Sequence, residues 1–456
     1  MVTTSYCVVG GGISGLAAAH RLRATLGDSA DITVFDPADR LGGLLRTEAL
    51  GGMSVDVGAE AFIARRPEVP ALLAELGLAD RQRSTTGVRP LLYSRRLLHP
   101  LPPDTLSGIP SSAESMTGLV DATTLARIAG EPNRPLVFEP GSDPALGALV
   151  ADRFGEQVVA CSVDPLIGGV YAGSAATVGL RSAVPGLAAL LDEGATSLTE
   201  AVRRALPTST GAPVFGAITG GYQVLVNELV RSARLRWVQS AVTQIDPLGD
   251  GDGWLLRDAG GGHHRADRVV VAVPAPVLAR LATGFAPRAA AAASRIGNAS
   301  SVVVAMAVPA GAAFPANSGV LVATGERLHT KAITLTSRKW GDRGYGGRVE
   351  VLRLSFGRFG DSRTSASDAE LVAWSVRDLE AVFGVTVDPI DVRVQRWPAA
   401  MPQYRSGHAG LVSGLRAALP PTIAVAGNYL DGIGVPACIA AADRAAAAVI
   451  RATPAP

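Results

Sequence analysis

The chain has 456 residues, of which 48% are hydrophobic and 18% are charged, a size and composition that suit two or three globular domains with an ample core. Its 42 basic and 40 acidic side chains give a formal net charge of +2, and without any basic run this excludes the electrostatic footprint of a nucleic-acid-binding protein. Since no uninterrupted apolar run approaches the roughly 18–20 residues of a spanning helix, we expect no transmembrane anchor.

The N-terminus is predicted to form a strand, a glycine-rich turn, a helix and a second strand in succession. An apolar strand over 6–9 leads into Gly10-Gly11-Gly12-Ile13-Ser14-Gly15, a helix follows over 16–26, and a strand over 31–35 ends on Asp36. The acid lies 21 positions beyond the last glycine of a Gly-x-Gly-x-x-Gly motif, and this whole context is typical of dinucleotide binding. A glycine-rich turn in some other strand–helix unit is the alternative.

The glycines and the start of the helix have distinct expected roles in holding a dinucleotide. Gly10 permits the tight turn, Gly12 lets the backbone approach a pyrophosphate, and Gly15 lets the helix pack closely on the strand. The first helical N–H groups, at Ile13 and Ser14, are then expected to donate to the phosphates, which the positive end of the helix dipole also favours.

The segment that follows the second strand favours a flavin dinucleotide over a nicotinamide one. Asp36 can accept hydrogen bonds from the adenosine ribose and repels a 2′-phosphate, which disfavours NADP. Beyond it, Gly42 and Gly43 allow the chain to pass close to the diphosphate and ribityl chain, and Arg40 can offset phosphate charge. The alternative for this segment is a surface turn with a solvated arginine.

A second glycine-rich turn near the C-terminus strengthens the flavin interpretation. A small apolar strand over 423–426 is followed by a turn that contains Gly427 and Gly434, and a helix is predicted over 437–448. The N–H groups at the start of this helix, near Val435, can reach the ribityl chain and the pyrimidine end of a flavin. A nicotinamide domain has no evident use for such a C-terminal return.

Shorter pieces between these two ends complete the expected cofactor site. Gly58-Ala59 would return the chain beneath the flavin. A strand over 236–245 would place the backbone of Val242 near the adenine, and a buried strand over 268–274 would bring Ala272 to the cofactor.

The middle of the chain divides into a helical part and a sheet-rich part. The segment 207–219, rich in Pro, Gly, Ser and Thr, is interpreted as a linker between them and the nucleotide-binding unit. Strands and one long helix are expected to floor a large substrate cavity. The predicted helices are 143–163, 184–206 and 368–383, and the predicted strands are 300–308, 332–336 and 349–355.

Together these motifs resemble the flavin-dependent amine oxidase superfamily and, within it, the protoporphyrinogen/coproporphyrinogen oxidase family of heme biosynthesis. The most specific matches are Asp164 to Gly173 (DPLIGGVYAG) and Arg396 to His408. The resemblance implies an α/β protein with a discontinuous Rossmann-type FAD-binding domain (p-hydroxybenzoate-hydroxylase-like), a mixed-sheet substrate domain and a helical insertion. The expected FAD-binding domain comprises 1–70, 215–275 and 410–456, the substrate-binding domain 71–105 and 276–409, and the mainly helical insertion, which contributes to the substrate cavity, 106–214.

The resemblance also implies an oxidoreductase that uses non-covalent FAD and molecular oxygen. Three successive hydride transfers from a porphyrinogen to the flavin would give an aromatic porphyrin and hydrogen peroxide, and because the flavin accepts the electrons, no side chain is assigned a catalytic role. A chain without anchoring features is similar to the soluble coproporphyrinogen III branch, and oxidation of protoporphyrinogen IX is the alternative. A flavin amine oxidase or carotenoid-desaturase-like enzyme, and a flavin-binding scaffold without activity, are the more distant alternatives.

Contacts with the macrocycle are implied for the Asp164 to Gly173 segment. Gly168, Gly169 and Gly173 would let a bulky ring approach the backbone, with a cluster of turn-forming glycines as the alternative. Tyr171 would wall the flavin or the macrocycle, and a satisfied core aromatic is the alternative.

Arginines are the expected partners of the propionate arms. Arg89 and Arg65 lie nearest to the family's substrate-facing segments, although the family's substrate arginine aligns nearer Pro90 than Arg89. Solvated surface arginines are the alternative. Trp397, in the second specific motif, is expected beside the flavin.

The few cysteines and lysines of the chain bear on how the cofactor is held and on the cellular compartment. Pro436-Ala437-Cys438 does not match the Ser-Gly-Gly-Cys tether of covalent monoamine oxidases, so we expect dissociable FAD. The only lysines are Lys331 and Lys339, and Lys339-Trp340 resembles a porphyrinogen-family feature. The three cysteines have no metal-ligand spacing and cannot all pair, which suits a reducing cytoplasm. Peripheral membrane contact and a transient contact with a downstream ferrochelatase are left open.

Overall fold

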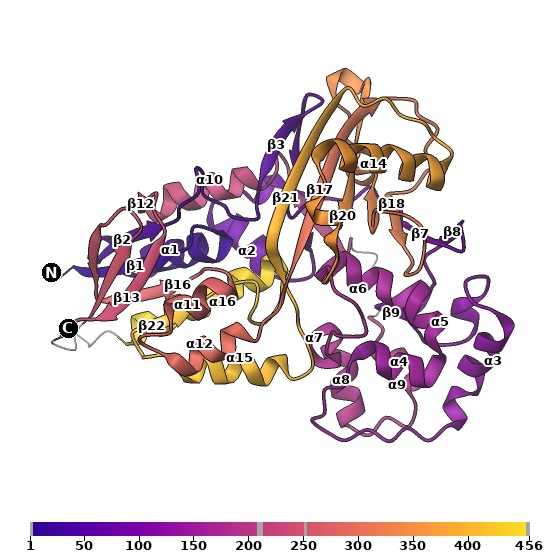
Figure 1. Ribbon diagram of the computed structural model, residues 1–456, viewed down its shortest axis with the longest axis horizontal. Helices are drawn as coiled ribbons and strands as arrows, with labels where there is room; N and C mark the ends of the chain where they lie inside the picture. Colours follow the sequence, from indigo (N-terminus) through magenta and orange to yellow (C-terminus); the bar gives the residue numbers. More distant parts are fainter. Residues whose placement is uncertain (1–2, 208–212, 250–252, 453–456) are drawn as a thin grey trace.

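The computed structural model describes residues 3–207, 213–249 and 253–452. Within these ranges, one layer is a five-stranded parallel sheet whose strands come from well-separated stretches of the chain. Figure 1 shows the indigo, pink and yellow strands side by side at one end of the molecule. In order across the sheet they are β12 (Arg236–Val238), β2 (Ala30–Phe35), β1 (Thr4–Val9), β16 (Arg268–Val271) and β22 (Ile423–Val425).

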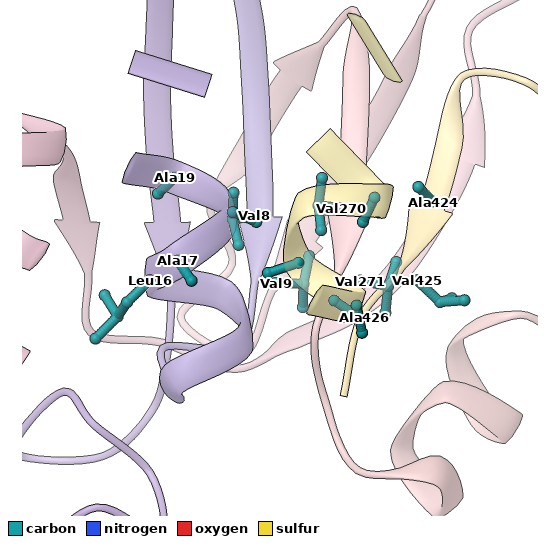
Figure 2. Close-up of a cluster of buried hydrophobic side chains, with 14 of the residues drawn as sticks. Val8, Val9, Leu16, Ala17, Ala19, Val270, Val271, Ala424, Val425 and Ala426 are labelled. Carbon is teal, nitrogen blue, oxygen red and sulfur yellow. The ribbon is translucent and has the colours of Figure 1, made fainter. Parts of the chain in front are cut away.

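Helix α1 (Ile13–Leu26) packs against α10 (Tyr222–Ala233) and α16 (Val435–Arg451) in the largest buried core. The buried sides of α1 and α16 are rich in alanine, and such small side chains let the helices approach each other and the strands closely. The strands contribute β-branched residues, which suit a sheet buried on both faces. Figure 2 shows part of this core, with Leu16 on α1 and with Val8, Val9, Val270, Val271 and Val425 on the neighbouring strands.

A small antiparallel sheet and further helices pack in the same core. The sheet consists of β13 (Val242–Pro247), β14 (Trp254–Asp258) and β15 (His263–Ala266), and its His264 ring lies edge-on to Phe35 at 4.8 Å. Residues of α11 (Ala275–Leu281), α12 (Pro287–Ser294) and α15 (His408–Ala417) also belong to this core. The expected division assigns most of α11 and all of α12 to the substrate-binding domain, and the core residues of α15 to the FAD-binding domain. The division itself stays a prediction.

The second layer, among the described residues, is a seven-stranded mixed sheet in which β18 and β7 pair in parallel and the other neighbours pair antiparallel. Alternate residues of its long strand β17 face opposite sides. Val302, Val304 and Met306 pack in one core with α14 (Asp368–Phe383), whereas Ala305 and Ala307 pack with the hairpin of β3 (Thr47–Leu50) and β4 (Met53–Asp56). The strand order is β21 (Asp391–Pro402), β17 (Asn298–Pro309), β20 (Val349–Phe356), β19 (Ala332–Thr334), β18 (Gly319–Val322), β7 (Leu91–Ser94) and β8 (Leu97–Pro100).

A helical cluster forms the third part of the molecule, and Figure 1 shows it below the mixed sheet. A buried Arg153–Glu131 ion pair ties it together, because Glu131 also accepts from the backbone N–H groups of Leu198 and Thr199. Its helices are α3 (Ala122–Gly130), α4 (Leu146–Phe154), α5 (Glu156–Val158), a π-helical turn (Val159–Val163), α6 (Asp164–Tyr171), α7 (Leu180–Ala183), α8 (Pro185–Asp192) and α9 (Leu198–Ala205).

Shorter elements connect these parts. Among the helices in the described ranges, none is both long and apolar enough to cross a membrane. Five short strands in the described ranges form a two-stranded antiparallel hairpin and a three-stranded antiparallel sheet. The remaining helices are α2 (Glu68–Glu75) and α13 (Thr336–Trp340), and the remaining strands are β5 (Phe62–Ile63), β6 (Gln82–Ser84), β9 (Thr105–Leu106), β10 (Ile109–Pro110) and β11 (Phe215–Ile218).

The structure corrects several predicted elements. The strand predicted over 236–245 is two strands in different sheets, β12 and β13. The helix predicted over 143–163 breaks at Gly155, whose φ is +97°, and the helix predicted over 184–206 breaks at Gly194, whose φ is +86°. Part of the predicted linker 207–219 is strand β11, while 208–212 lies outside the described residues.

Candidate functional site

The turn between β1 and α1 contains glycines that the packing itself requires. Gly10 has a φ of +111°, and a Cβ on it would lie 2.4 Å from the carbonyl oxygen of Ala272. A Cβ on Gly15 would lie 1.9 Å from the carbonyl oxygen of Gly10. Because neither contact is tolerable, α1 can pack this closely on β1 only with glycine at both positions.

Gly12 differs from these glycines because its backbone is open on one side. Among the described residues, a Cβ there would meet only the Cα of Gly43, at 3.9 Å, and its φ of −74° is one that any residue adopts. Gly12 is the N-cap of α1 and supplies no side-chain cap, so the first-turn N–H groups, those of Ile13 and Ser14 included, depend on another acceptor. An open glycine face beside an uncapped helix start suits a phosphate, and these residues therefore fit a dinucleotide.

Asp36 lies just beyond β2 with its carboxylate against the glycine turn. Its Oδ2 accepts from the Gly11 N–H at 2.7 Å, and its Oδ1 accepts from the Ala38 N–H at 2.9 Å. Each oxygen keeps a further lone pair, so the carboxylate can still accept from a ribose hydroxyl. The Gly11 contact was missed by the sequence analysis, because the motif assigns roles only to the other glycines of the turn.

Arg40 organises the loop that carries Gly42 and Gly43. Its guanidinium donates to the carbonyl oxygens of Leu41, Gly43 and Leu45, at 3.2, 2.6 and 2.9 Å. The loop lies over the first glycine turn, since the Gly42 N–H donates to the Gly11 carbonyl at 2.8 Å. Arg40 therefore shapes the backbone that would face the diphosphate, and its predicted role of offsetting phosphate charge stays a prediction.

The loops that follow four of the parallel strands lie together at the carboxyl ends of these strands. Gly10 follows β1, Asp36 follows β2, Ala272 follows β16, and Gly427 lies two residues beyond β22. Ala272 is held there by its N–H, which donates to the Val9 carbonyl at 2.7 Å. Pieces from the start, middle and end of the chain thus converge where a nucleotide binds in such sheets.

The C-terminal turn supplies a second uncapped helix start. Gly434 is the N-cap of α16, Val435 is its first residue, and no side chain of the N-cap closes the helix. Gly427 has a φ of +154°, and the Asn428 carbonyl accepts from the Tyr404 hydroxyl, which ties the turn to the preceding loop. Val242 lies buried at the start of β13, next to an irregularity in the register of β13 and β14.

Gly58 and Ala59 lie where the hairpin β3–β4 meets the mixed sheet. A Cβ on Gly58 would lie 1.9 Å from the Leu44 carbonyl oxygen, and the Ala59 N–H donates to that same oxygen at 3.3 Å. The indole N–H of Trp397, on β21, donates to the Val57 carbonyl at 3.0 Å. Trp397 therefore braces the chain at Gly58, and direct contact with a flavin stays a prediction.

An ion-pair network, missed by the sequence analysis apart from its lysine, follows Gly58 directly. Glu60 lies 2.7 Å from Lys339 Nζ and 3.4 Å from Arg353 Nη1, and Arg353 also donates to the Gly58 carbonyl at 2.8 Å. Burial acts to raise the pKa of Glu60, but the charges of Lys339 and Arg353 prevail and lower it to about 2. The network fixes the Gly58 segment to α13 and β20.

The glycines in α6 and just after it make room for side chains from distant parts of the chain. The position of a Cβ on Gly168 lies 2.8 Å from Arg358 Nη1, and that on Gly173 lies 2.5 Å from Gln403 Oε1. On Gly169 it lies 3.5 Å from a methyl group of Leu321, an ordinary contact. Neither Arg358 nor Gln403 could be predicted at this position, since both are distant along the chain from α6.

The remaining predicted substrate residues differ in burial. Tyr171 packs edge-on against Tyr404 at 5.5 Å and donates its hydroxyl to the Ser182 carbonyl at 3.2 Å, and burial raises its pKa. Arg65 and Arg89 are exposed, and in the described ranges neither forms an ion pair. Their pairing with propionates stays a prediction.

An open groove of about 580 Å³ lies between α12 and α15. It is bordered by Arg288, Arg295 and small residues of α15, and its lining includes none of the predicted flavin or substrate residues. The large substrate cavity expected over the mixed sheet stays a prediction.

The parallel sheet with two glycine-rich helix starts, joined to a mixed sheet, defines a dinucleotide-binding α/β protein with a second, mixed-sheet layer. A family model described as flavin containing amine oxidoreductase matches residues 13–450. The chain therefore belongs to the flavin-containing amine oxidoreductase family, and its cofactor is a flavin. The predicted family, the Rossmann-type fold and the oxidoreductase class are confirmed.

Individual relatives support a narrower grouping. The chain is 64% identical to a coproporphyrinogen III oxidase of Mycobacterium tuberculosis over 453 residues, which cover 99% of this chain and 98% of the relative. It is 27% identical to the enzyme of that name from Bacillus subtilis, over 97% of this chain and 96% of the relative. A crystal structure designated protoporphyrinogen oxidase, from Exiguobacterium sp. 255-15, matches with a TM-score of 0.88 at 25% identity, covering 99% of this chain and 100% of that one.

Proposed function

We propose that this chain is an FAD-dependent oxidase that converts coproporphyrinogen III to coproporphyrin III in heme biosynthesis. The observation that carries the proposal is the 64% identity, over 99% of the chain, to mycobacterial proteins named coproporphyrinogen III oxidase. Solved amine oxidases at 15–16% identity support the shared fold alone. We further propose a cytoplasmic location and a transient contact with a downstream ferrochelatase.

The residues that follow the carboxyl ends of the parallel strands would hold FAD. Gly12 with the N–H groups of Ile13 and Ser14 would bind the pyrophosphate, and Asp36 would bind the adenosine ribose. The helix start at Val435 would face the ribityl chain and the pyrimidine end. A covalent link is not expected, because the Cys438 thiol is buried inside the core, where burial raises its pKa to about 11.

When bound, FAD supplies the acceptor for successive hydride transfers from the macrocycle, with oxygen as the final acceptor and hydrogen peroxide as product. The chain's own contribution is to place the two partners. The Glu60–Lys339–Arg353 network would keep the Gly58 segment from moving, and Trp397 would hold the same segment against β21. Arg353 is buried, Glu60 and Lys339 are partly exposed, and all three charges are paired, so their role would be to position the segment.

The test is aerobic turnover of both porphyrinogens by the purified, FAD-loaded protein. Porphyrin fluorescence reports the product, and a coupled peroxidase assay reports hydrogen peroxide. We expect a higher kcat/KM for coproporphyrinogen III than for protoporphyrinogen IX. A strong preference for the divinyl substrate would overturn the proposal.

Oxidation of protoporphyrinogen IX is the second candidate function. It is favoured by the designation of the Exiguobacterium structure and by 24% identity, over 96% of this chain, to a chloroplast protoporphyrinogen oxidase from Arabidopsis thaliana. The same parallel kinetics decide between the two substrates.

A further inference from the structure

Arg358 occupies the space that the missing side chain of Gly168 leaves on α6. Its Nη1 lies 3.1 Å from Oδ2 of Asp164, the first residue of that helix. Asp164, only 4% exposed, also accepts from the Ala175 N–H at 2.7 Å and from the Thr324 hydroxyl. A buried, fully engaged carboxylate therefore fixes the guanidinium against the glycine-rich helix, and Figure 1 shows this helix between the mixed sheet and the helical cluster.

Lys331, the residue before β19, contacts Gly357, the neighbour of Arg358 in the chain, and is 9% exposed. Its Nζ donates to the Gly357 carbonyl at 2.7 Å and to the Ser301 hydroxyl at 3.4 Å, both of which are uncharged. In the part of the chain that the structure describes, no carboxylate lies within an ion-pair distance of 4.0 Å from this ammonium. Burial, and then the charge of Arg358, lower the pKa of Lys331 to about 7 against the opposing charge of Asp361.

The carboxylates around Lys331 already have partners. Asp361 pairs with Arg363 at 2.9 Å, and Asp378, on α14, lies 3.3 Å from the ring of His329. With Asp164 held by Arg358, the ammonium of Lys331 is the unmatched charge among the described residues of this cluster. Because a buried cation without an anion is costly, a carboxylate from a ligand would complete the cluster.

We infer that Arg358 and Lys331 together bind one propionate carboxylate of the substrate and so determine specificity for propionate-bearing tetrapyrroles. The inference rests on the proposed function and names a carboxylate site for it. The Arg358 side chain is 23% exposed. Its Nη1 donates to Asp164 and its Nη2 donates to the Val322 carbonyl at 3.4 Å, which leaves further N–H groups of the guanidinium for a ligand carboxylate, while Lys331 adds a point charge. The exposed Arg65 and Arg89 lack such a scaffold in the described structure.

The first experiment measures steady-state kinetics on coproporphyrinogen III for the FAD-loaded wild type, Arg358→Gln and Arg358→Lys. Loss of a charge-assisted contact should raise KM about 10- to 100-fold in Arg358→Gln, with kcat changed by less than about threefold. Arg358→Lys keeps the charge and should lie between the two. The matched control is Arg288→Gln, an exposed arginine on α12, which should leave both constants unchanged.

The second experiment separates a carboxylate contact from a structural effect. Binding of coproporphyrin III and of its tetramethyl ester is measured by fluorescence in one detergent-containing buffer. The wild type should bind the free acid at least about tenfold more tightly, and Arg358→Gln and Lys331→Met should lose that difference. In the wild type the preference should weaken as the pH rises past about 7, where free Lys331 loses its proton, and Lys331→Met should remove this pH dependence.

The outcomes distinguish this inference from the proposed function. If the wild type oxidises neither porphyrinogen, the proposed function fails. If the wild type is active but Arg358→Gln retains the wild-type KM and the preference for the free acid, the carboxylate site is refuted while the function stands. If Arg358→Gln does not fold or does not retain FAD, Lys331→Met decides the question through the comparison of acid and ester.

Discussion

The two glycines Gly12 and Gly15 lie three residues apart in one turn, and the structure predicts opposite consequences for replacing them with alanine. A Cβ on Gly15 would lie 1.9 Å from the Gly10 carbonyl oxygen and 3.2 Å from a methyl group of Val8. A Cβ on Gly12 would reach only the Cα of Gly43 among the described residues, at 3.9 Å. Gly15→Ala should therefore damage the fold, whereas Gly12→Ala should damage cofactor binding.

The magnitudes follow from these distances. Ordinary contact begins at 3.4 Å, so Gly15→Ala must move α1 and the turn apart by 3.4 − 1.9 = 1.5 Å. Displacing a close-packed helix in this way costs about 3 kcal/mol or more. Gly12→Ala should cost the apoprotein at most about 1 kcal/mol, the difference between glycine and alanine at an N-cap. The added methyl group would obstruct the phosphate contacts of the helix start. The loss of these contacts should weaken FAD binding by about 3 kcal/mol, which is roughly a 100-fold rise in Kd.

The assay combines thermal unfolding of the apoproteins with titration of FAD by flavin fluorescence. Gly186→Ala, in α8, is a matched control, because a Cβ there meets nothing within 4 Å, and it should be neutral or slightly stabilising. An unfolding temperature for Gly15→Ala equal to that of the wild type would refute the packing argument. A Gly12→Ala variant that binds FAD as tightly as the wild type would refute the assignment of its open face to the pyrophosphate.

Three further predictions concern charge, cofactor release and the helical cluster. The pKa of Glu60 in the folded protein, about 2, lies below its ordinary value of 4.5, so its ion pairs stabilise the protein at neutral pH by up to about 3 kcal/mol. This contribution is lost as the pH falls from about 4.5 towards 2. In urea unfolding between pH 3 and 7, the free energy of unfolding of Glu60→Gln should therefore depend less on pH than that of the wild type. After unfolding in guanidinium chloride and ultrafiltration, all flavin should pass into the filtrate, and flavin that stays with the denatured chain would contradict non-covalent binding. The buried thiols should react with a thiol reagent at pH 8 only after unfolding. Glu131→Gln should lower stability by about 3 kcal/mol in urea unfolding, because it leaves Arg153 buried without its anion, whereas an unchanged midpoint would show that the pair contributes nothing.

Local signals in the sequence were sufficient for elements whose ends carry capping residues. The helix predicted over 368–383 matches α14 because Ser367 and Glu370 form a capping box at its start and Gly384 adopts the left-handed conformation at its end. Gly155 is likewise a glycine directly after the last helical residue, and using it would have ended the predicted 143–163 helix where α4 ends, at Phe154. The two strands within 236–245 were less accessible, since a local apolar pattern does not show that the chain changes sheets.

The site was predictable where backbone geometry is local and unpredictable where it depends on packing between distant segments. The steric need for glycine at positions 10 and 15 follows from a short motif. By contrast, Arg358 meets Gly168 across 358 − 168 = 190 positions, and Gln403 meets Gly173 in the same way. The sequence showed a glycine-rich segment there, but only the folded chain shows which side chains fill the space above it.

The parallel sheet has a consequence for biosynthesis. Its edge strand β22 pairs with β16, and helix α16 packs against α1, so segments from the end of the described chain contact segments that are made earlier. On the ribosome, a nascent polypeptide that stops before residue 423 lacks both strand β22 and the helix start at Val435. The second uncapped helix start is therefore complete only after the C-terminal stretch has been made, and until then β16 has an unpaired side of the kind that favours aggregation.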